Sequence, residues 1–344
     1  MKLFKAFVLP LLLTILTPVA LAQPEPRPLR QISGPAHFSP DARLLVHYVQ
    51  QQLHFVDSDN QQLLQRISSV RSLHPSHFNA DGRFVAISES PDRISIWQTR
   101  PFTRRVQIQE PLPVGQRQFS FALSADAMYL TLARLEPAGN NYLNLYLHVW
   151  DLARRRRLQR LFVTRLENVM PGHTPDVSLA YHPLGGYLSV AVESMPQSGQ
   201  APLLMVRDLR QHQWLYWLPG SSPLSYSGNG KYFAFSVPGP QDAQVRLWHT
   251  PSNLLKTVPL SAAAPPAPLL ALSARGRWLA FARPASLGQQ ELQVLRVRDL
   301  KPVLNVALQS GADTFSFHRN ERQLLVSSQA NPDFLPLLYT LPQE

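Results

Sequence analysis

A short pattern recurs along most of this chain, and its spacing restricts the possible folds more than any other feature. Each copy has an apolar residue, a polar residue, a turn centred on Asp or Asn with Gly or Ala, a basic residue and an apolar run, most clearly at residues 38–43, 78–83, 226–231 and 272–277. The anchors of the copies are Asp41, Asp81, Asp126, Leu184, Asn229, Arg275 and Asn320. Successive anchors are 40, 45, 58, 45, 46 and 45 residues apart.

Two further positions keep the same chemistry in every copy. The residue three before the anchor and the residue four after it are always apolar or aromatic: Phe38, Phe78, Leu123, Tyr181, Tyr226, Leu272 and Phe317 before it, and Leu45, Val85, Leu130, Leu188, Phe233, Leu279 and Leu324 after it. Repeats of about 40–45 residues are typical of β-propeller blades. Period-two alternation and dense turns predict four short strands in each unit. The length allows one to three domains, but the repeat predicts one.

Strand counting predicts a ring of seven blades. In the second unit, strands are expected at residues 76–79, 83–88, 94–98 and 104–109. One strand at residues 29–33 precedes the first anchor, six complete units follow, and residues 315–341 supply three more strands. We therefore predict an all-β protein in which residues 29–344 form a single seven-bladed β-propeller of four-stranded antiparallel blades.

The expected third strands end in a shared signature, which occurs as Ile96-Trp97-Gln98, Val149-Trp150-Asp151, Val206-Arg207-Asp208, Leu247-Trp248-His249 and Val297-Arg298-Asp299. On this signature and its period, residues 29–341 resemble the WD-repeat family. Trp150-Asp151 is the complete copy of the family's dipeptide, and the family's Gly-His pair is missing. The resemblance implies that the amino-terminal strand completes the last blade, so that the ring closes without a long open edge.

The first residues predict export. Lys2 and Lys5 precede an apolar run at residues 6–16, and Ala20-Leu21-Ala22 then leads into a proline-rich stretch. This is the pattern of a secretory signal peptide, residues 1–22, with cleavage after Ala22 and a short linker at 23–28. A retained membrane anchor is the weaker alternative, because the run is shorter than the roughly 20 residues that span a bilayer. We expect a periplasmic protein whose mature chain has no transmembrane segment.

The composition excludes several kinds of chemistry. The chain has no cysteine, which excludes disulfides, thiolate metal sites and cysteine nucleophiles. Residues 227–231 lack the spacing of a phosphate-binding loop, and no Gly-x-Ser-x-Gly motif occurs. His37 and His77 share a repeat position but have no third ligand for a catalytic zinc site. We therefore expect no catalytic residue, cofactor or metal site.

Several acidic and aromatic residues have structural explanations. Asp41, Asp81 and Asp126 are expected to cap the turns that follow the first strands. Asp151, Asp208 and Asp299 are expected to do the same after the third strands. Trp214 and Trp217 lie on an expected outer strand, where packing against neighbouring strands explains them as well as a docking site does.

Two surfaces carry candidate partner-binding residues. The formal charge of +11 falls to +9 without Lys2 and Lys5, and a basic protein favours anionic partners. On the face that holds the turns between first and second and between third and fourth strands, the lower face, the candidates are Arg104, Arg105, Arg154, Arg155, Arg156 and Arg157. On the upper face, long polar connections are expected at 134–142, 167–176 and 193–202. The candidates there are Glu136, Asn140, Tyr142 and Glu193.

The leading functional hypothesis is a non-catalytic periplasmic scaffold that binds a protein or peptide partner, and an acidic partner would suit its basic charge. The alternatives are a small-molecule hydrolase of the propeller lactonase type and a binder of an anionic envelope polymer or nucleic acid, with nucleic acid the less favoured. Propellers host all of these functions, so the fold does not choose among them.

Overall fold

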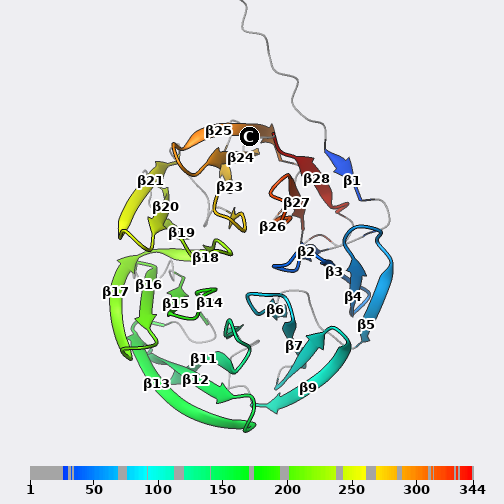
Figure 1. Ribbon diagram of the computed structural model, residues 1–344. Coiled ribbons are helices and arrows are strands. Elements are labelled where there is room, and N and C mark those ends of the chain that lie inside the picture. The colour runs from blue at the N-terminus through cyan, green and yellow to red at the C-terminus, as the bar shows by residue number, and fades with distance from the viewer. Residues whose placement is uncertain are drawn as a thin grey trace, which may run out of the picture.

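Seven four-stranded antiparallel sheets stand around a central axis, which confirms the predicted seven-bladed β-propeller (Figure 1). The computed structural model describes residues 26–342, except 30–31, 33–34, 69–75, 91, 112–119, 140, 170–173, 194–200, 238–242, 261–268, 285–288, 309–310, 313, 329–330 and 332–333. Within these residues the structure consists of strands and turns, and it has no helix that could cross a membrane.

The first four blades follow the repeat in chain order. Blade one has β2 (Ala36–Phe38), β3 (Leu44–Val49), β4 (Gln52–Asp57) and β5 (Leu63–Ser68). Blade two has β6 (Ser76–Phe78), β7 (Phe84–Ser90), β8 (Arg93–Thr99) and β9 (Phe102–Gln109). Blade three has β10 (Ser120–Leu123), β11 (Tyr129–Pro137), β12 (Leu143–Asp151) and β13 (Arg156–Leu166). Blade four has β14 (Val177–Tyr181), β15 (Tyr187–Val192), β16 (Leu203–Asp208) and β17 (Gln213–Pro219).

The last three blades complete the ring. Blade five has β18 (Ser221–Tyr226), β19 (Tyr232–Val237), β20 (Gln244–His249) and β21 (Leu254–Pro259). Blade six has β22 (Leu270–Leu272), β23 (Trp278–Pro284), β24 (Gln290–Arg296) and β25 (Lys301–Ala307). Blade seven has β26 (Thr314–Phe317), β27 (Gln323–Ser327), β28 (Leu337–Thr340) and β1 (Arg27–Pro28).

The two apolar columns of the repeat are cross-strand neighbours in all seven blades. Phe38 pairs with Leu45 and Phe78 with Val85, and the same pairing continues at Leu123–Leu130, Tyr181–Leu188, Tyr226–Phe233, Leu272–Leu279 and Phe317–Leu324. Apolar pairs at this position let each sheet pack against the next blade. The buried clusters accordingly contain residues of adjacent blades, such as Ile96 of blade two with Leu132 of blade three.

The acidic residues of the turns act as caps, as predicted. The backbone N–H of Arg43 donates to Asp41 and that of Met128 to Asp126, and Ser39 and Ser124 also donate to these carboxylates. After the third strands, Asp151, Asp208 and Asp299 accept backbone N–H groups in the same way. A side-chain oxygen that mimics a backbone acceptor stabilises such turns. These residues are therefore explained by local structure.

The signature predicted for the third strand of blade six is out of register. Leu295 pairs with Leu279 in blade six as Trp97 pairs with Val85 in blade two. Leu295 therefore holds the central position of the signature. Val297, Arg298 and Asp299 lie beyond the end of β24, in the turn that leads to β25. The resemblance of Val-Arg-Asp to the signature was misleading because Asp299 caps this turn from a position three residues later than that of Asp151 in blade three.

The amino-terminal strand completes blade seven and closes the ring, but it lies earlier than residues 29–33. β1 pairs with β28 through Arg27–Leu338 and Pro28–Leu337, and the N–H of Leu29 donates to the carbonyl of Pro336 over 3.0 Å. Proline has no N–H to donate, and an outer strand tolerates it because the backbone groups on the solvent side of that strand need no partner strand. The proline-rich stretch predicted as a linker therefore supplies this strand.

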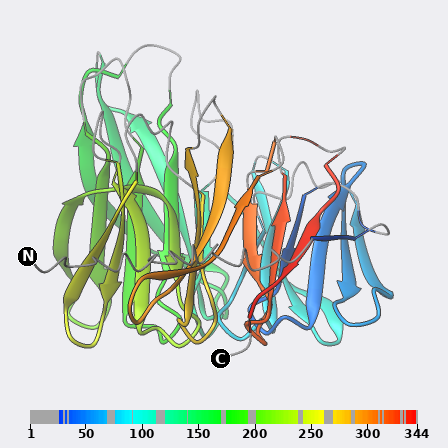
Figure 2. The ribbon, with the colours of Figure 1, turned by 90° about the horizontal axis from the view of Figure 1, so that it is seen from above.

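Blade three has the longest strands of the ring. β11 and β12 have nine residues each and β13 has eleven, whereas β7, β8 and β9 of blade two have seven, seven and eight. The prediction of a long loop at 134–142 is therefore wrong, because β11 continues to Pro137 and only residues 138–142 connect it to β12. Figure 2 shows the green strands of blade three rising above the other blades on the upper face.

A histidine links blades four and five on the lower face. The Nε2 of His182 donates to the carbonyl of Gly230 over 2.9 Å, and its Nδ1 accepts the N–H of Leu184. Burial lowers the pKa of His182, although the bond to Gly230 opposes this shift. The two bonds therefore hold a neutral ring in one tautomer.

We expect Gly230→Ala to reduce the free energy of unfolding by about 2 kcal/mol. Gly230 has a φ of +69°, and a Cβ atom there would lie 2.6 Å from Cε1 of His182. The matched control is Gly185→Ala, since Gly185 has a φ of +79° but no atom within 4 Å of an added Cβ. The control should lose only the free energy of placing alanine in the left-handed backbone conformation, about 1 kcal/mol. Equal losses in urea unfolding would show that the His182 link contributes nothing.

Candidate functional site

Two β-bulges decide which side chains of blade three face blade two. The registers of β12 and β13 shift between Leu145 and Tyr146 and between Val149 and Trp150. The bulges place one more residue on β13 than on β12 at each point. On the face toward blade two, the rows across β11, β12 and β13 are Leu130–Trp150–Arg157, Leu132–His148–Arg160, Arg134–Tyr146–Phe162 and Glu136–Asn144–Arg165.

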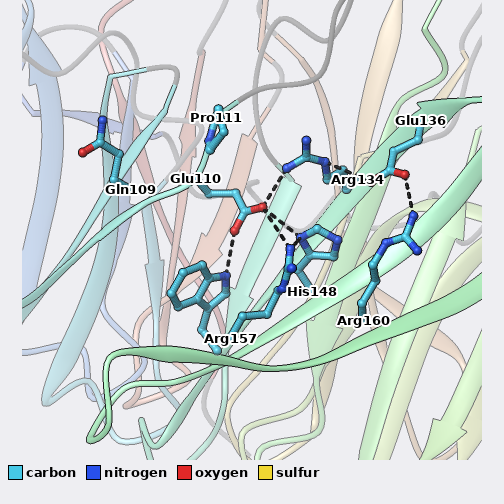
Figure 3. Close-up of a pocket in the computed structure, with 9 residues that line it drawn as sticks. Gln109, Glu110, Pro111, Arg134, Glu136, His148, Arg157 and Arg160 are labelled. Atoms are coloured by element: carbon cyan, nitrogen blue, oxygen red, sulfur yellow. Dashed lines mark hydrogen bonds and ion pairs between the residues drawn. The ribbon is translucent and has the colours of Figure 1, made fainter.

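Glu110 lies where blade two ends against these rows. It follows β9, and its carboxylate accepts from Arg134 Nη1 at 2.7 Å and His148 Nδ1 at 2.9 Å through Oε1. Its Oε2 accepts from Trp150 Nε1 at 3.1 Å. Figure 3 shows Arg134, His148 and Arg157 converging on this carboxylate. Both oxygens of Glu110 are thus engaged by groups from two strands of the next blade.

The electrostatics of this cluster keep Glu110 ionised. Burial raises the pKa of Glu110, but the hydrogen bond from His148 and the charges of His148, Arg134 and Arg157 outweigh it, so its pKa is lowered. Arg134 also lies 3.2 Å from Glu136, and Arg160 lies 2.6 Å from Glu136 on the other side. The result is a chain of alternating charges along the boundary between blades two and three.

A depression of about 660 Å³ opens beside this chain of charges. Its lining residues come from the end of blade two and the rising part of blade three, namely Gln109, Glu110, Pro111, Arg134, Glu136, His148, Trp150, Arg157 and Arg160. Guanidinium groups dominate its charged surface, so it can bind an anionic group. His148 is only 1 % exposed, and its Nδ1 is held by Glu110.

Aromatic and arginine side chains lie beside the depression, in and next to the rows of Arg134 and Glu136. Tyr146 and Phe162 make an edge-to-face contact with ring centroids 5.6 Å apart, and Phe162 is 52 % exposed. The guanidinium of Arg160 stacks on Tyr146, with its Cζ 3.6 Å from the ring centroid. Arg165 lies over Tyr142 in the same manner, at 5.8 Å. We call Tyr142, Tyr146, Arg160, Phe162 and Arg165 the blade-three patch.

The structure places the predicted lower-face arginines on two blades. Arg104 and Arg105 lie within β9 and contact Glu89 and Gln98. Arg154 and Arg155 form the turn before β13, where Arg154 pairs with Asp151 at 2.8 Å, and Arg156 and Arg157 begin the strand itself. Of these candidates, Arg157 is the one that lines the depression.

The predicted upper-face residues separate in a similar way. Glu136 lies within β11 and lines the depression, and Tyr142 belongs to the blade-three patch. Asn140 lies outside the described residues. Glu193 follows β15 in blade four and accepts a hydrogen bond from Ser222 of blade five, so it belongs to another blade boundary.

Sequence reasoning missed most of the residues that make the depression. Glu110, Arg134, His148 and Arg160 were not candidates, and Trp150 was noted only for its place in the signature. One signal was available, because the interval of 58 between Asp126 and Leu184 marks blade three as longer than the others. The histidines at the shared repeat position have a packing role: His37 lies against Phe78 and His77 against Phe121.

Comparison with known proteins supports the fold alone. No protein-family model matches the sequence, and a search of curated proteins finds no match. Among solved structures, hydrazine synthase of Kuenenia stuttgartiensis is similar with a TM-score of 0.61 and 15% identity, over 93% of this chain and 97% of that one. The β-propeller domain of Cps50 (Swd1) from Myceliophteria thermophila is similar with a TM-score of 0.63 and 11% identity, over 90% and 96%.

Proposed function

We propose that this protein is an exported, non-catalytic β-propeller scaffold that works in the periplasm and binds an acidic protein or peptide partner at the blade-three patch. The observation that carries the proposal is the patch itself, an exposed set of aromatic rings and guanidinium groups on strands that extend past the neighbouring blade. Tyrosine and arginine are enriched among the residues that dominate binding at protein interfaces.

The charge of the patch favours an acidic partner. Arg160 stacks on Tyr146, and Arg165 lies over Tyr142 and donates from Nε to Asn144. Both keep donors for a ligand, since a guanidinium has five N–H groups. The stacked guanidinium of Arg160 is held in place before the partner arrives, so less side-chain entropy is lost on binding. With Arg160 paired to Glu136, the charge of Arg165 leaves the patch net positive, which speeds the encounter with an acidic partner.

We expect Phe162→Ser to weaken capture of the partner at least about tenfold, because truncation of a central aromatic anchor costs about 2 kcal/mol. The measurement is cross-linked capture from the native periplasmic extract by the immobilised protein. Leu254→Ser is the matched control, since Leu254 is 61 % exposed on β21 of blade five. Support requires one dominant acidic protein whose capture depends on Phe162 and not on Leu254. Equal capture by both variants would rule out this patch.

We also expect the exported protein to begin at Gln23. Small residues at Ala20 and Ala22 flank Leu21, which is the pattern that signal peptidases cleave. Amino-terminal sequencing of the protein from the periplasmic fraction tests this. A start at Met1 in the membrane fraction would overturn both the cleavage and the location.

A further inference from the structure

We infer that the depression beside Glu110 is a subsite for a single carboxylate of the partner, held by Arg157 and Arg160. This inference rests on the proposed function and specifies the chemistry that the patch would recognise.

The first argument is the balance of charge in the depression. Its lining contains three guanidinium groups, on Arg134, Arg157 and Arg160, and two carboxylates, on Glu110 and Glu136. One guanidinium group is therefore left without a carboxylate of its own. A phosphate group carries about −1.5 to −2 charges at neutral pH, whereas one carboxylate matches a single free guanidinium.

The second argument identifies the arginine that is not fully used. Arg134 is 18 % exposed and lies within 3.2 Å of both Glu110 and Glu136. Arg157 is 47 % exposed, and among the described residues its nearest carboxylate oxygen is that of Glu110 at 3.8 Å. Oε1 of Glu110, the oxygen nearest Arg157, already accepts from Arg134 and His148, which uses both of its lone pairs.

The third argument is the placement of the two arginines. The bulge at Leu158 puts Arg157 opposite Trp150 and Arg160 opposite His148, so the two side chains share a face in adjacent rows. Arg160 uses its Nη2 for Glu136 and stacks on Tyr146, which fixes its plane. Two guanidinium groups in adjacent rows can both donate to one carboxylate between them.

The surroundings indicate what carries the carboxylate. Tyr146 and the exposed ring of Phe162 lie in the next row above Arg160. An apolar side chain beside the bound carboxylate would contact these rings. The ligand is therefore a peptide segment with an acidic group next to an apolar residue. The acidic group can be a side chain or the carboxyl terminus of the partner, because both present the same oxygens.

The indole N–H of Trp150 is a direct probe for this subsite, since it donates to Glu110 within the lining. Its signal in a two-dimensional NMR spectrum, assigned with Trp150→Phe, can be followed while peptides are added. Three hexapeptides distinguish a side-chain carboxylate from a carboxyl terminus. The first has an internal Glu-Phe pair and an amidated end, the second has Gln for Glu and a free carboxyl-terminal Phe, and the third has Gln and an amidated end.

We expect the Trp150 signal to shift saturably with the first or the second peptide and not with the neutral third one. Arg157→Ser should weaken this binding at least about tenfold, as the loss of a charge-assisted contact requires. The matched control replaces Arg154, Arg155 and Arg156 with serine and keeps Arg157. This control removes more charge than Arg157→Ser but should bind the peptide within about threefold of the parent at physiological salt.

Four outcomes would overturn the subsite. These are equal shifts with the neutral peptide, equal affinity in Arg157→Ser, tighter binding of inorganic phosphate than of either acidic peptide, and no shift up to about 10 mM peptide, where even weak single-site ligands bind. The result is separable from the proposed function. Capture that depends on Phe162 but not on Arg157 would support the proposed scaffold and contradict the carboxylate subsite. Peptide binding at the subsite without capture of a partner would support the subsite and contradict the scaffold.

Discussion

A chain that begins at Gly34 will lose about 4 kcal/mol of unfolding free energy relative to one that begins at Gln23, because it lacks the residues that close the ring. It loses the pairing of β1 with β28 and the bond from Leu29 to Pro336. It also loses Ile32, which is 2 % exposed in a cluster that joins Leu325 of blade seven to Val56 of blade one. The loss should affect the whole ring, since each blade is supported by its neighbours.

Urea unfolding followed by tryptophan fluorescence measures this effect through the midpoint of the transition. The control chain begins at Pro26 and so removes only residues that precede β1. It should unfold at the same midpoint as the chain that begins at Gln23. If the chain from Gly34 also kept this midpoint, closure by the amino-terminal segment would contribute no stability.

The variant Glu110→Gln will be less stable by about 3 kcal/mol at pH 7, because it leaves buried donors without their anion. Glu110 is 5 % exposed and accepts from Arg134, His148 and Trp150. An amide of the same shape can accept through only one oxygen and carries no charge. Glu291→Gln is the matched control, because Glu291 pairs with Arg283 over 2.8 Å while both side chains are about a third exposed. Exposed pairs contribute less than about 1 kcal/mol.

The pH dependence gives this prediction a second test. The pKa of Glu110 in the folded protein lies below its ordinary value of 4.5. A carboxyl group with a lowered pKa stabilises the fold above its unfolded pKa, and that stability disappears as the pH falls through the folded pKa. The difference in unfolding free energy between the parent and Glu110→Gln should therefore be full above about pH 5.5 and shrink below pH 4.5. A difference that stayed constant down to pH 3 would show that the ion pairs contribute nothing.

Much of the fold could be predicted because its determinants are close together in the sequence. Phe38 and Leu45 are seven residues apart and lie opposite each other across one turn, and Asp41 caps that turn. The same short-range unit recurs in every blade, so a fixed period indicates both the strands and their number. The sequence predicted that an amino-terminal strand closes the ring, but it placed that strand at residues 29–33 and not at Arg27–Pro28. The reason is that a proline-rich outer strand has the composition of a linker.

The sequence alone thus determined the propeller, its seven blades and the turn caps, because each of these depends on contacts within one hairpin. Only the tertiary structure decided the site. Glu110 meets Arg134 and His148 across 24 and 38 residues, from a different blade. Simple alternation would place Arg157 and Arg160 on opposite faces of β13, and the bulge at Leu158 brings them to the same one. Packing between blades and an irregular register leave no period in the sequence, which is why these residues come together only in the folded ring.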